Sequence, residues 1–348
     1  MIELRTPRGL PVSVPESREE DPSPRFMLDR AGEARKYYDE HGYVVFRNLL
    51  PAQACEQIRG LWEREVKPFD GFMYRQATAR AERHAKNPNG WIMNPILNLQ
   101  SLDPAKFPGM RQFATEQVLT SPALVACFRL LLGEAPKLVQ SMYFEGNSAT
   151  WEHQDSYYLD SEKVGEMAAA WIAVEDIGAA AGRFFICPGS HRISLRDHSL
   201  LNNIAGNHEA YIQSVVREIR ERKLEIRAPR LNQGDVLFWN SLTIHGSLDS
   251  QDAHRSRSSI TCHAIPASRR FLQLQTRVLD LPAEDFGSCS LYRPKDLARP
   301  ANRAVLLLES RFPRAFYWLK KQAIVSLMRL KGARGPREVG VRAARNPL

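Results

Sequence analysis

The feature that most limits the fold is a series of short apolar segments between residues 136 and 277. Segments at 138–144, 236–239 and 258–265 read as strands, and turn residues such as Gly234-Asp235 separate them. Many short strands at regular spacing indicate a β-sandwich or a barrel. A double-stranded β-helix, the cupin-like jelly roll, accommodates this number of strands. We therefore expect a mainly β fold with flanking helices.

Helical patterns lie on both sides of this predicted core. Two of them flank a short strand at 43–46, and Gly42 is expected to end the first helix. The proline- and charge-rich N-terminus is expected to be irregular. The predicted organisation is an irregular segment at 1–25, a main domain at 26–300 and a basic helix and tail at 301–348. The main domain has a jelly-roll core at about 136–277, with a helical insertion at about 192–224.

The five cysteines are scattered through the chain and form no CxxC pair. No apolar run reaches the roughly 18 residues needed to cross a bilayer. The first 20 residues lack the apolar centre of a secretory signal. These features predict a cytoplasmic protein with reduced thiols.

The stretch around His153 and Asp155 reads as extended, and it places an imidazole and a carboxylate two residues apart. Residues i and i+2 of a strand point to the same face, so these two side chains could bind one metal ion. Two histidines and one carboxylate on one face of an iron leave the other face open, as in non-haem Fe(II) oxygenases. Because a lone His-x-Asp is common, the prediction depends on a second histidine.

His245 is the best candidate for that histidine, because it follows a turn and an apolar strand well downstream. Four other histidines compete with it. His191 is typical of a turn, His198 and His208 lie in the expected helical insertion, and His263 could be a core histidine with satisfied hydrogen bonds. Of the neighbouring residues, Gln154 is expected to point away from the metal, and Trp239 to belong to the core in preference to the pocket wall.

Several motifs occur together in one order along the chain. They are His153-Gln154-Asp155, 171–176 (WIAVED), Pro188-Gly189-Ser190-His191, 234–239 (GDVLFW), His245-Gly246-Ser247 and 257–263 (RSSITCH). With the N-terminal His41-Gly42-Tyr43-Val44-Val45, this order resembles the phytanoyl-CoA dioxygenase (PhyH-like) family of Fe(II)/2-oxoglutarate oxygenases. The resemblance covers roughly residues 35–277.

The resemblance implies roles for individual residues. His153, Asp155 and His245 match the iron ligands, and Arg257 matches the arginine that pairs with the far carboxylate of 2-oxoglutarate. A guanidinium suits that task because its fork meets a carboxylate with two hydrogen bonds. The gap between His245 and Arg257 is about one residue longer than usual, so Arg255 is the alternative. Ser247, Gln140 and Tyr143 are further candidates for cofactor contacts.

The activity implied by the resemblance is an Fe(II)-, 2-oxoglutarate- and O2-dependent hydroxylation of an unactivated C–H bond, with release of succinate and CO2. Asp155 retains the carboxylate that halogenases of this superfamily lack, which favours hydroxylation, desaturation or ring closure. Fold alone does not choose the substrate. A specialised small molecule is preferred, a lipid-linked or acyl substrate at a membrane surface is one alternative, and a non-catalytic metal-binding jelly roll is another.

The net charge of +9 belongs to the C-terminal tail, because residues 311–348 contain ten Lys or Arg and one acid, Glu338. The body therefore has no basic excess, and a nucleic-acid partner is not expected. Residues 303–331 read as a helix interrupted near Pro313. This helix could pack on the body, lie on a membrane surface or contact an acidic partner.

Overall fold

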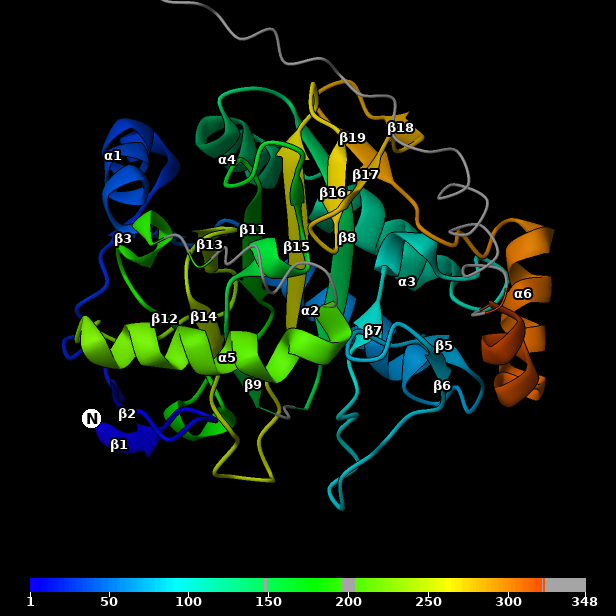
Figure 1. Cartoon of the computed structure of the whole chain (residues 1–348), viewed down its shortest axis with the longest axis horizontal. Helices are drawn as coiled ribbons and strands as arrows, with labels where there is room; N and C mark the ends of the chain where they lie inside the picture. Colours follow the sequence, from blue (N-terminus) through cyan, green and yellow to red (C-terminus); the bar gives the residue numbers. More distant parts are fainter. Residues whose placement is uncertain (147–148, 194, 196–203, 321, 323–348) are drawn as a thin grey trace, which may run out of the picture.

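The computed structural model describes residues 1–146, 149–193, 195, 204–320 and 322, and it shows a β core surrounded by helices (Figure 1). The largest sheet has nine strands, and eight of them follow the order β18-β19-β8-β15-β11-β13-β4-β3, with β7 also paired to β8. Its strands are β3 (Arg25–Phe26), β4 (Tyr43–Phe46), β7 (Ile96–Leu97), β8 (Pro136–Phe144), β11 (Ala168–Ala173), β13 (Val236–Asn240), β15 (Ser259–Pro266), β18 (Ala283–Asp285) and β19 (Ser290–Tyr292).

A smaller sheet faces the large one and has the order β12-β14-β9. Its strands are β9 (Thr150–His153), β12 (Phe184–Ile186) and β14 (His245–Ser247). A further sheet contains β10 (Leu159–Ser161), β16 (Phe271–Gln273) and β17 (Arg277–Leu279), and a hairpin is formed by β5 (Met73–Tyr74) and β6 (Ala81–Glu82). The protein is thus a cupin-like jelly roll, as the spacing of the apolar segments predicts.

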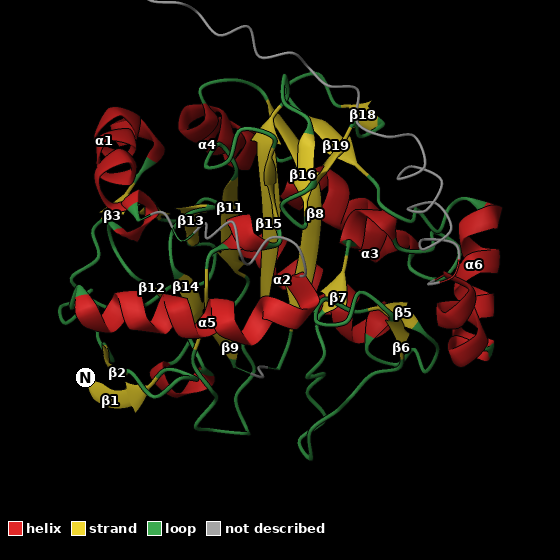
Figure 2. Cartoon of the chain, viewed as in Figure 1, coloured by secondary structure: helices red, strands yellow, loops and turns green. Residues whose placement is uncertain are grey.

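The central strands of the large sheet are buried on both faces, because their alternate side chains enter two different cores. Ala170 and Ile172 of β11 pack with Phe238 of β13 in an outer core, whereas Trp171 and Trp239 enter an inner core toward the small sheet. Helices cover the outer face and complete the outer core (Figure 2). They are α1 (Ala31–His41), α2 (Ala52–Leu61), α3 (Pro108–Phe113) and α4 (Pro122–Leu132).

The predicted helical insertion is represented by α5 (Ile204–Glu221), which packs on the small-sheet side of the molecule. The apolar residues that identify it in the sequence, such as Ile212 and Val215, are buried against Cys187 and Ile244. The insertion therefore lies beside the strands that carry His153 and His245.

The predicted helix–strand–helix opening and the role of Gly42 are confirmed, because Gly42 ends α1 with a left-handed φ of 75°. The expectation of an irregular N-terminal segment was wrong. Strands β1 (Ile2–Arg5) and β2 (Pro11–Val14) form a hairpin whose alternate residues Val12 and Val14 are buried. Two-residue alternation in so short a segment is hard to distinguish from loop sequence.

The C-terminal helix begins at α6 (Pro300–Arg311), breaks at Phe312 and resumes over 313–320. This agrees with the predicted interruption near Pro313. The rest of the predicted helix, apart from residue 322, lies outside the described residues. Within the described part of the chain, no helix is both long and apolar enough to cross a bilayer.

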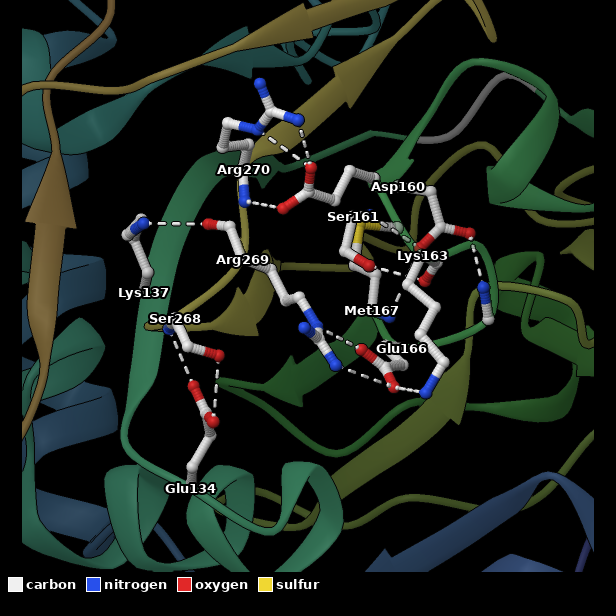
Figure 3. Close-up of polar contacts among 12 residues, drawn as sticks. Glu134, Lys137, Asp160, Ser161, Lys163, Glu166, Met167, Ser268, Arg269 and Arg270 are labelled. Atoms are coloured by element: carbon white, nitrogen blue, oxygen red, sulfur yellow. Dashed lines mark hydrogen bonds and ion pairs between the residues drawn. The ribbon is translucent and has the colours of Figure 1, made fainter.

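The turn between β10 and β11 is tied to the core by the buried carboxylate of Asp160 (Figure 3). This carboxylate accepts hydrogen bonds from the backbone N–H groups of Gly165 and Met167 and from the Ser241 hydroxyl. Burial raises the pKa of Asp160 to about 6, against the opposing effect of these hydrogen bonds. Because Ser241 precedes His245 by four residues, this bond also helps to fix the loop that leads into β14.

The backbone of Gly234 approaches the backbone of Leu50 closely, and a substitution can test this contact. It has a φ of +86°, and an added Cβ would lie 2.3 Å from the backbone oxygen of Leu50. Gly133 has a similar φ of +80° but open space around it. We expect Gly133→Ala to lower the free energy of unfolding by about 1 kcal/mol, the cost of the left-handed conformation. Gly234→Ala should cost about 3 kcal/mol or more, because backbone cannot move aside.

Urea unfolding of both variants measures this difference directly. Equal losses of stability in Gly133→Ala and Gly234→Ala would show that the contact between Gly234 and Leu50 is not a close one.

Candidate metal centre

Two neighbouring strands and one turn bring together the three predicted ligands. His153 is the last residue of β9 and pairs in register with His245, the first residue of β14. The sequence pattern predicted that Asp155 and His153 lie on the same face of one strand, and this was wrong. The strand ends at His153, and Asp155 opens a 3-10 turn (Asp155–Tyr157) that directs its carboxylate back toward the histidines.

The donor atoms of these residues converge on one point. Oδ1 of Asp155 lies 3.7 Å from Nε2 of His153 and 3.5 Å from Nε2 of His245. All three side chains are buried, and their ligand atoms lie within 4.8 Å of one another. Two imidazoles and one carboxylate grouped in this way match the donor set of a 2-His-1-carboxylate iron site.

Hydrogen bonds orient both imidazoles toward this point. Nδ1 of His153 lies 2.8 Å from the backbone oxygen of Trp151, and Nδ1 of His245 lies 2.9 Å from that of Thr243. If each Nδ1 donates its proton to the carbonyl, each Nε2 keeps a free lone pair for a metal. Burial lowers the pKa of His153, which favours the neutral ring that binds metals.

The other carboxylate oxygen of Asp155 has its own partners. The indole N–H of Trp239 donates to Oδ2 over 2.8 Å, and Nε2 of His263 lies 3.4 Å from the same oxygen. Burial alone would raise the pKa of Asp155, but the His245 and His263 rings beside it hold that pKa well below its usual value. The carboxylate is therefore kept in its charged, metal-binding form.

The sequence did not reveal these contacts with Asp155, because Trp239 was expected in the core or the pocket wall and His263 was either a competing ligand candidate or a core histidine. A usable signal was present for His263. Arg257, Thr261 and His263 are separated by even numbers of residues, and all three line the same pocket. Side chains with this spacing on an extended segment share a face. If Arg257 points into the cofactor pocket, His263 should therefore point into it as well.

A pocket of about 480 Å³, partly open to solvent, surrounds the three ligands. Met142, Phe144, Trp171 and Phe184 supply most of its apolar wall. Arg257 reaches it from the segment before β15. Its side chain is 2% exposed, and its guanidinium lies between the rings of Phe144 and Trp171 at 5.2 and 5.6 Å from their centroids.

Arg257 has the environment of a group prepared for an anion. Nη1 donates to the backbone oxygen of Gly182 over 2.9 Å, Nε has no hydrogen-bond partner, and no described carboxylate forms an ion pair with this arginine. Burial lowers its pKa to about 9, so it stays charged at neutral pH. Arg255, the alternative, is exposed and pairs with Asp252 at 3.1 Å.

Of the three remaining candidates for cofactor contacts, one lines the pocket and two do not. Ser247 lines the pocket, and its hydroxyl accepts a hydrogen bond from the backbone N–H of Thr150. Gln140 lies on β8 with the parity of Met142 but does not line the pocket. The structure does not bring Tyr143 into the pocket, because this ring packs in the outer core and stacks on Trp62 at 4.0 Å.

The insertion helix α5 holds the turn between the ligands. The backbone N–H of Gln154 donates to the hydroxyl of the buried Tyr211 over 2.8 Å, and Tyr211 stacks on Tyr157 at 3.6 Å. As expected, the Gln154 side chain points away from the ligands, and its amide donates to the backbone oxygen of Leu242. One residue therefore links the Asp155 turn both to α5 and to the loop before His245.

Of the competing histidines that the structure describes, His191 and His208 lie away from the ligand cluster. His191 lies near the end of α1, where its Nε2 is 3.2 Å from the backbone oxygen of Asp39. His208 on α5 contacts the hydroxyl of Tyr158 at 2.8 Å. His198 lies outside the described residues.

The chain is similar to known proteins over most of its length. The family model described as phytanoyl-CoA dioxygenase (PhyH) matches residues 38–258. The peroxisomal phytanoyl-CoA dioxygenase of Homo sapiens is 25% identical over 252 residues, which cover 70% of each chain. The 1-deoxypentalenic acid 11-beta-hydroxylase of Streptomyces exfoliatus is 22% identical over 264 residues, which cover 70% of this chain and 83% of the hydroxylase.

Solved structures share the fold. The non-haem alpha-ketoglutarate-dependent epimerase SnoN from nogalamycin biosynthesis has a TM-score of 0.51 at 16% identity, and the match covers 78% of this chain and 98% of SnoN. EctD from S. alaskensis, solved with 2-oxoglutarate and 5-hydroxyectoine, has a TM-score of 0.50 at 17% identity, with 85% of this chain and 94% of EctD covered.

The hydrogen bond from Trp239 to Asp155 should strengthen metal binding. Trp239→Phe removes the indole N–H and leaves Asp155 Oδ2 free to turn, so we expect the affinity for Fe(II) or Mn(II) to fall about tenfold or more. Calorimetric titration of the anaerobic protein measures this change.

Trp62→Phe is the matched control, because Trp62 is equally buried but lies in the outer core, away from Asp155. An equal loss of affinity in both variants would mean that Trp239 acts only through general packing.

Proposed function

Because this chain belongs to the phytanoyl-CoA dioxygenase family, we propose that it hydroxylates an unactivated C–H bond of a small molecule, with release of succinate and CO2. Its cofactors are those of the family, Fe(II) and 2-oxoglutarate, with O2 as co-substrate. The observation that best supports the proposal is the presence of two complementary sites in one pocket. The three converging ligands suit Fe(II), and the buried Arg257, unpaired with any described carboxylate, suits the dicarboxylate 2-oxoglutarate.

When bound, Fe(II) and 2-oxoglutarate would supply the oxidising power by coupling decarboxylation of the oxo acid to oxygen insertion from O2. The chain's own residues position these groups. His153 and His245 would bind iron through Nε2, and Asp155 through the oxygen that Trp239 does not hold. Arg257 would receive the far carboxylate of 2-oxoglutarate, while the rings of Phe144 and Trp171 exclude water from the ion pair.

The apolar wall of the pocket favours a substrate with a hydrocarbon portion. The relatives and structural neighbours of this chain act on or bind molecules as different as phytanoyl-CoA, 1-deoxypentalenic acid, nogalamycin RO and 5-hydroxyectoine. This variety supports a small-molecule substrate without choosing one, and a specialised metabolite remains our preferred class. Because Asp155 supplies the carboxylate ligand, hydroxylation is proposed in preference to halogenation.

The proposed reaction is tested by measuring 2-oxoglutarate-dependent succinate formation in air, with added Fe(II) and a panel of candidate small molecules. The wild-type protein should form succinate, and a true substrate should increase the rate and yield an alcohol. Asp155→Ala should form none while remaining folded. Equal succinate formation by the wild type and Asp155→Ala, or none from the Fe(II)-loaded wild type, would contradict the proposal.

Substitution of Arg257 and of Arg255 tests which of the two arginines binds 2-oxoglutarate. Arg257→Gln removes the buried guanidinium, so we expect the Kd for 2-oxoglutarate to rise about 100-fold, equivalent to about 2.7 kcal/mol for a charge-assisted bidentate contact. The affinity for Fe(II) should stay the same, because Arg257 is not a ligand. Anaerobic calorimetry gives both values, with Fe(II) titrated into the metal-free protein and 2-oxoglutarate titrated into the metal-loaded protein.

Arg255→Gln is the control and should leave both affinities unchanged, since it breaks only an exposed ion pair. If Arg255→Gln weakens 2-oxoglutarate binding and Arg257→Gln does not, the two arginines have been assigned the wrong way round.

A further inference from the structure

The exposed large apolar side chains of the described chain gather near its C-terminal end. Six of the twelve lie between residues 305 and 319, and among them Leu307 is 65% exposed and Trp318 is 61% exposed. The other six are spread over the rest of the molecule. We define the C-terminal patch as Leu307, Leu308, Phe312, Trp318 and Leu319, which lie on α6, at the break that follows it and on the helix at 313–320, at the edge of the molecule (Figure 1).

Packing on the body explains only one side of these two helices. The buried carboxylate of Glu309 accepts hydrogen bonds from the backbone N–H of Ala81 and from the Tyr317 hydroxyl. Arg80 lies over the Tyr317 ring at 4.4 Å from its centroid. These contacts anchor the helices to the β5–β6 hairpin, and the five side chains of the C-terminal patch remain exposed.

The exposed charges on the segment that carries the patch are of one sign. The exposed charged residues from 299 to 320 are all basic, and the only acid in this range, Glu309, is buried. These basic residues are Arg299, Arg303, Arg311, Arg314 and Lys320. In the sequence, no further acid occurs before Glu338, whereas five more Lys or Arg residues do.

We propose that the C-terminal patch docks on an anionic lipid bilayer surface. A helical surface that combines Leu, Phe and Trp with Lys and Arg is the composition of interfacial membrane helices. Tryptophan favours the boundary between headgroups and acyl chains, and anionic headgroups attract the basic side chains. The proposal is independent of the oxygenase reaction.

The positive charge of this segment disfavours two other partners for the patch, a second copy of the chain and the sequence after residue 322. A second copy of this chain would bring the same basic residues to a symmetric interface. The sequence that follows residue 322 has the same positive sign. An anionic bilayer instead supplies both the opposite charge and an apolar interior.

Vesicle sedimentation tests this with the full-length, metal-loaded protein. We expect binding to vesicles of phosphatidylcholine and phosphatidylglycerol, weaker binding at high salt and little binding to phosphatidylcholine alone. The variant Leu307→Glu/Leu308→Glu should bind the anionic vesicles roughly tenfold or more weakly, because two inserting side chains become charged. No binding of the wild type to anionic vesicles would overturn the proposal.

The matched control is Leu28→Glu/Val278→Glu, which makes the same charge change at two exposed apolar positions elsewhere. It should bind almost as well as the wild type. An equal loss in both double variants would show that overall charge, not the patch, controls binding, and would overturn the assignment.

Two further measurements locate the contact. Tryptophan emission should shift to the blue when anionic vesicles are added, and the shift should be largely lost in Trp318→Phe; an unchanged shift would contradict docking by the patch. Sedimentation velocity without lipid should show the same oligomeric state for the wild type and Leu307→Glu/Leu308→Glu. A wild-type dimer that this variant dissociates would make the patch a self-interface and overturn the proposal.

Discussion

The contacts of the buried Asp155 carboxylate organise the inner face of this jelly roll. A buried charge is costly unless other groups compensate for it, and here each oxygen has partners from different strands. Oδ1 faces His153 and His245 from β9 and β14, and Oδ2 faces Trp239 and His263 from β13 and β15. The same contacts join the small sheet to the large one and define the point at which a metal can bind.

The insertion helix α5 extends this dependence beyond the strands. Through Tyr211 it contacts the backbone of Gln154, between two ligands, and its apolar residues pack beside His245. The position of helix α5 therefore matters for the metal centre, because a shift of this helix would move the Asp155 turn. The C-terminal patch lies instead on α6, which is anchored to the β5–β6 hairpin, so the proposed membrane contact and the metal centre rest on different elements.

Much of this arrangement could be predicted from the sequence because it follows from local periodicity. Short apolar segments gave most of the strands of the jelly roll, and the ordered motifs led to the family and to residues that the fold brings together. Four positions show the limits. The N-terminal hairpin was too short to recognise, Asp155 lies in a turn, Tyr143 enters the outer core, and Trp239 contacts a carboxylate 84 positions away in the chain. The hairpin and the turn are too short for a periodic pattern, whereas the positions of Tyr143 and Trp239 depend on tertiary contacts that no local pattern records.

Anaerobic titration with Fe(II) and 2-oxoglutarate tests the central claim most directly, because it reports the metal and its co-substrate together in one site. Chelation of Fe(II) by the 2-oxo acid should give a weak visible charge-transfer band in the wild-type protein. His245→Ala should lose that band while keeping its fold by circular dichroism. A folded wild-type protein without the band, or a band that survives unchanged in His245→Ala, would contradict the proposed iron site.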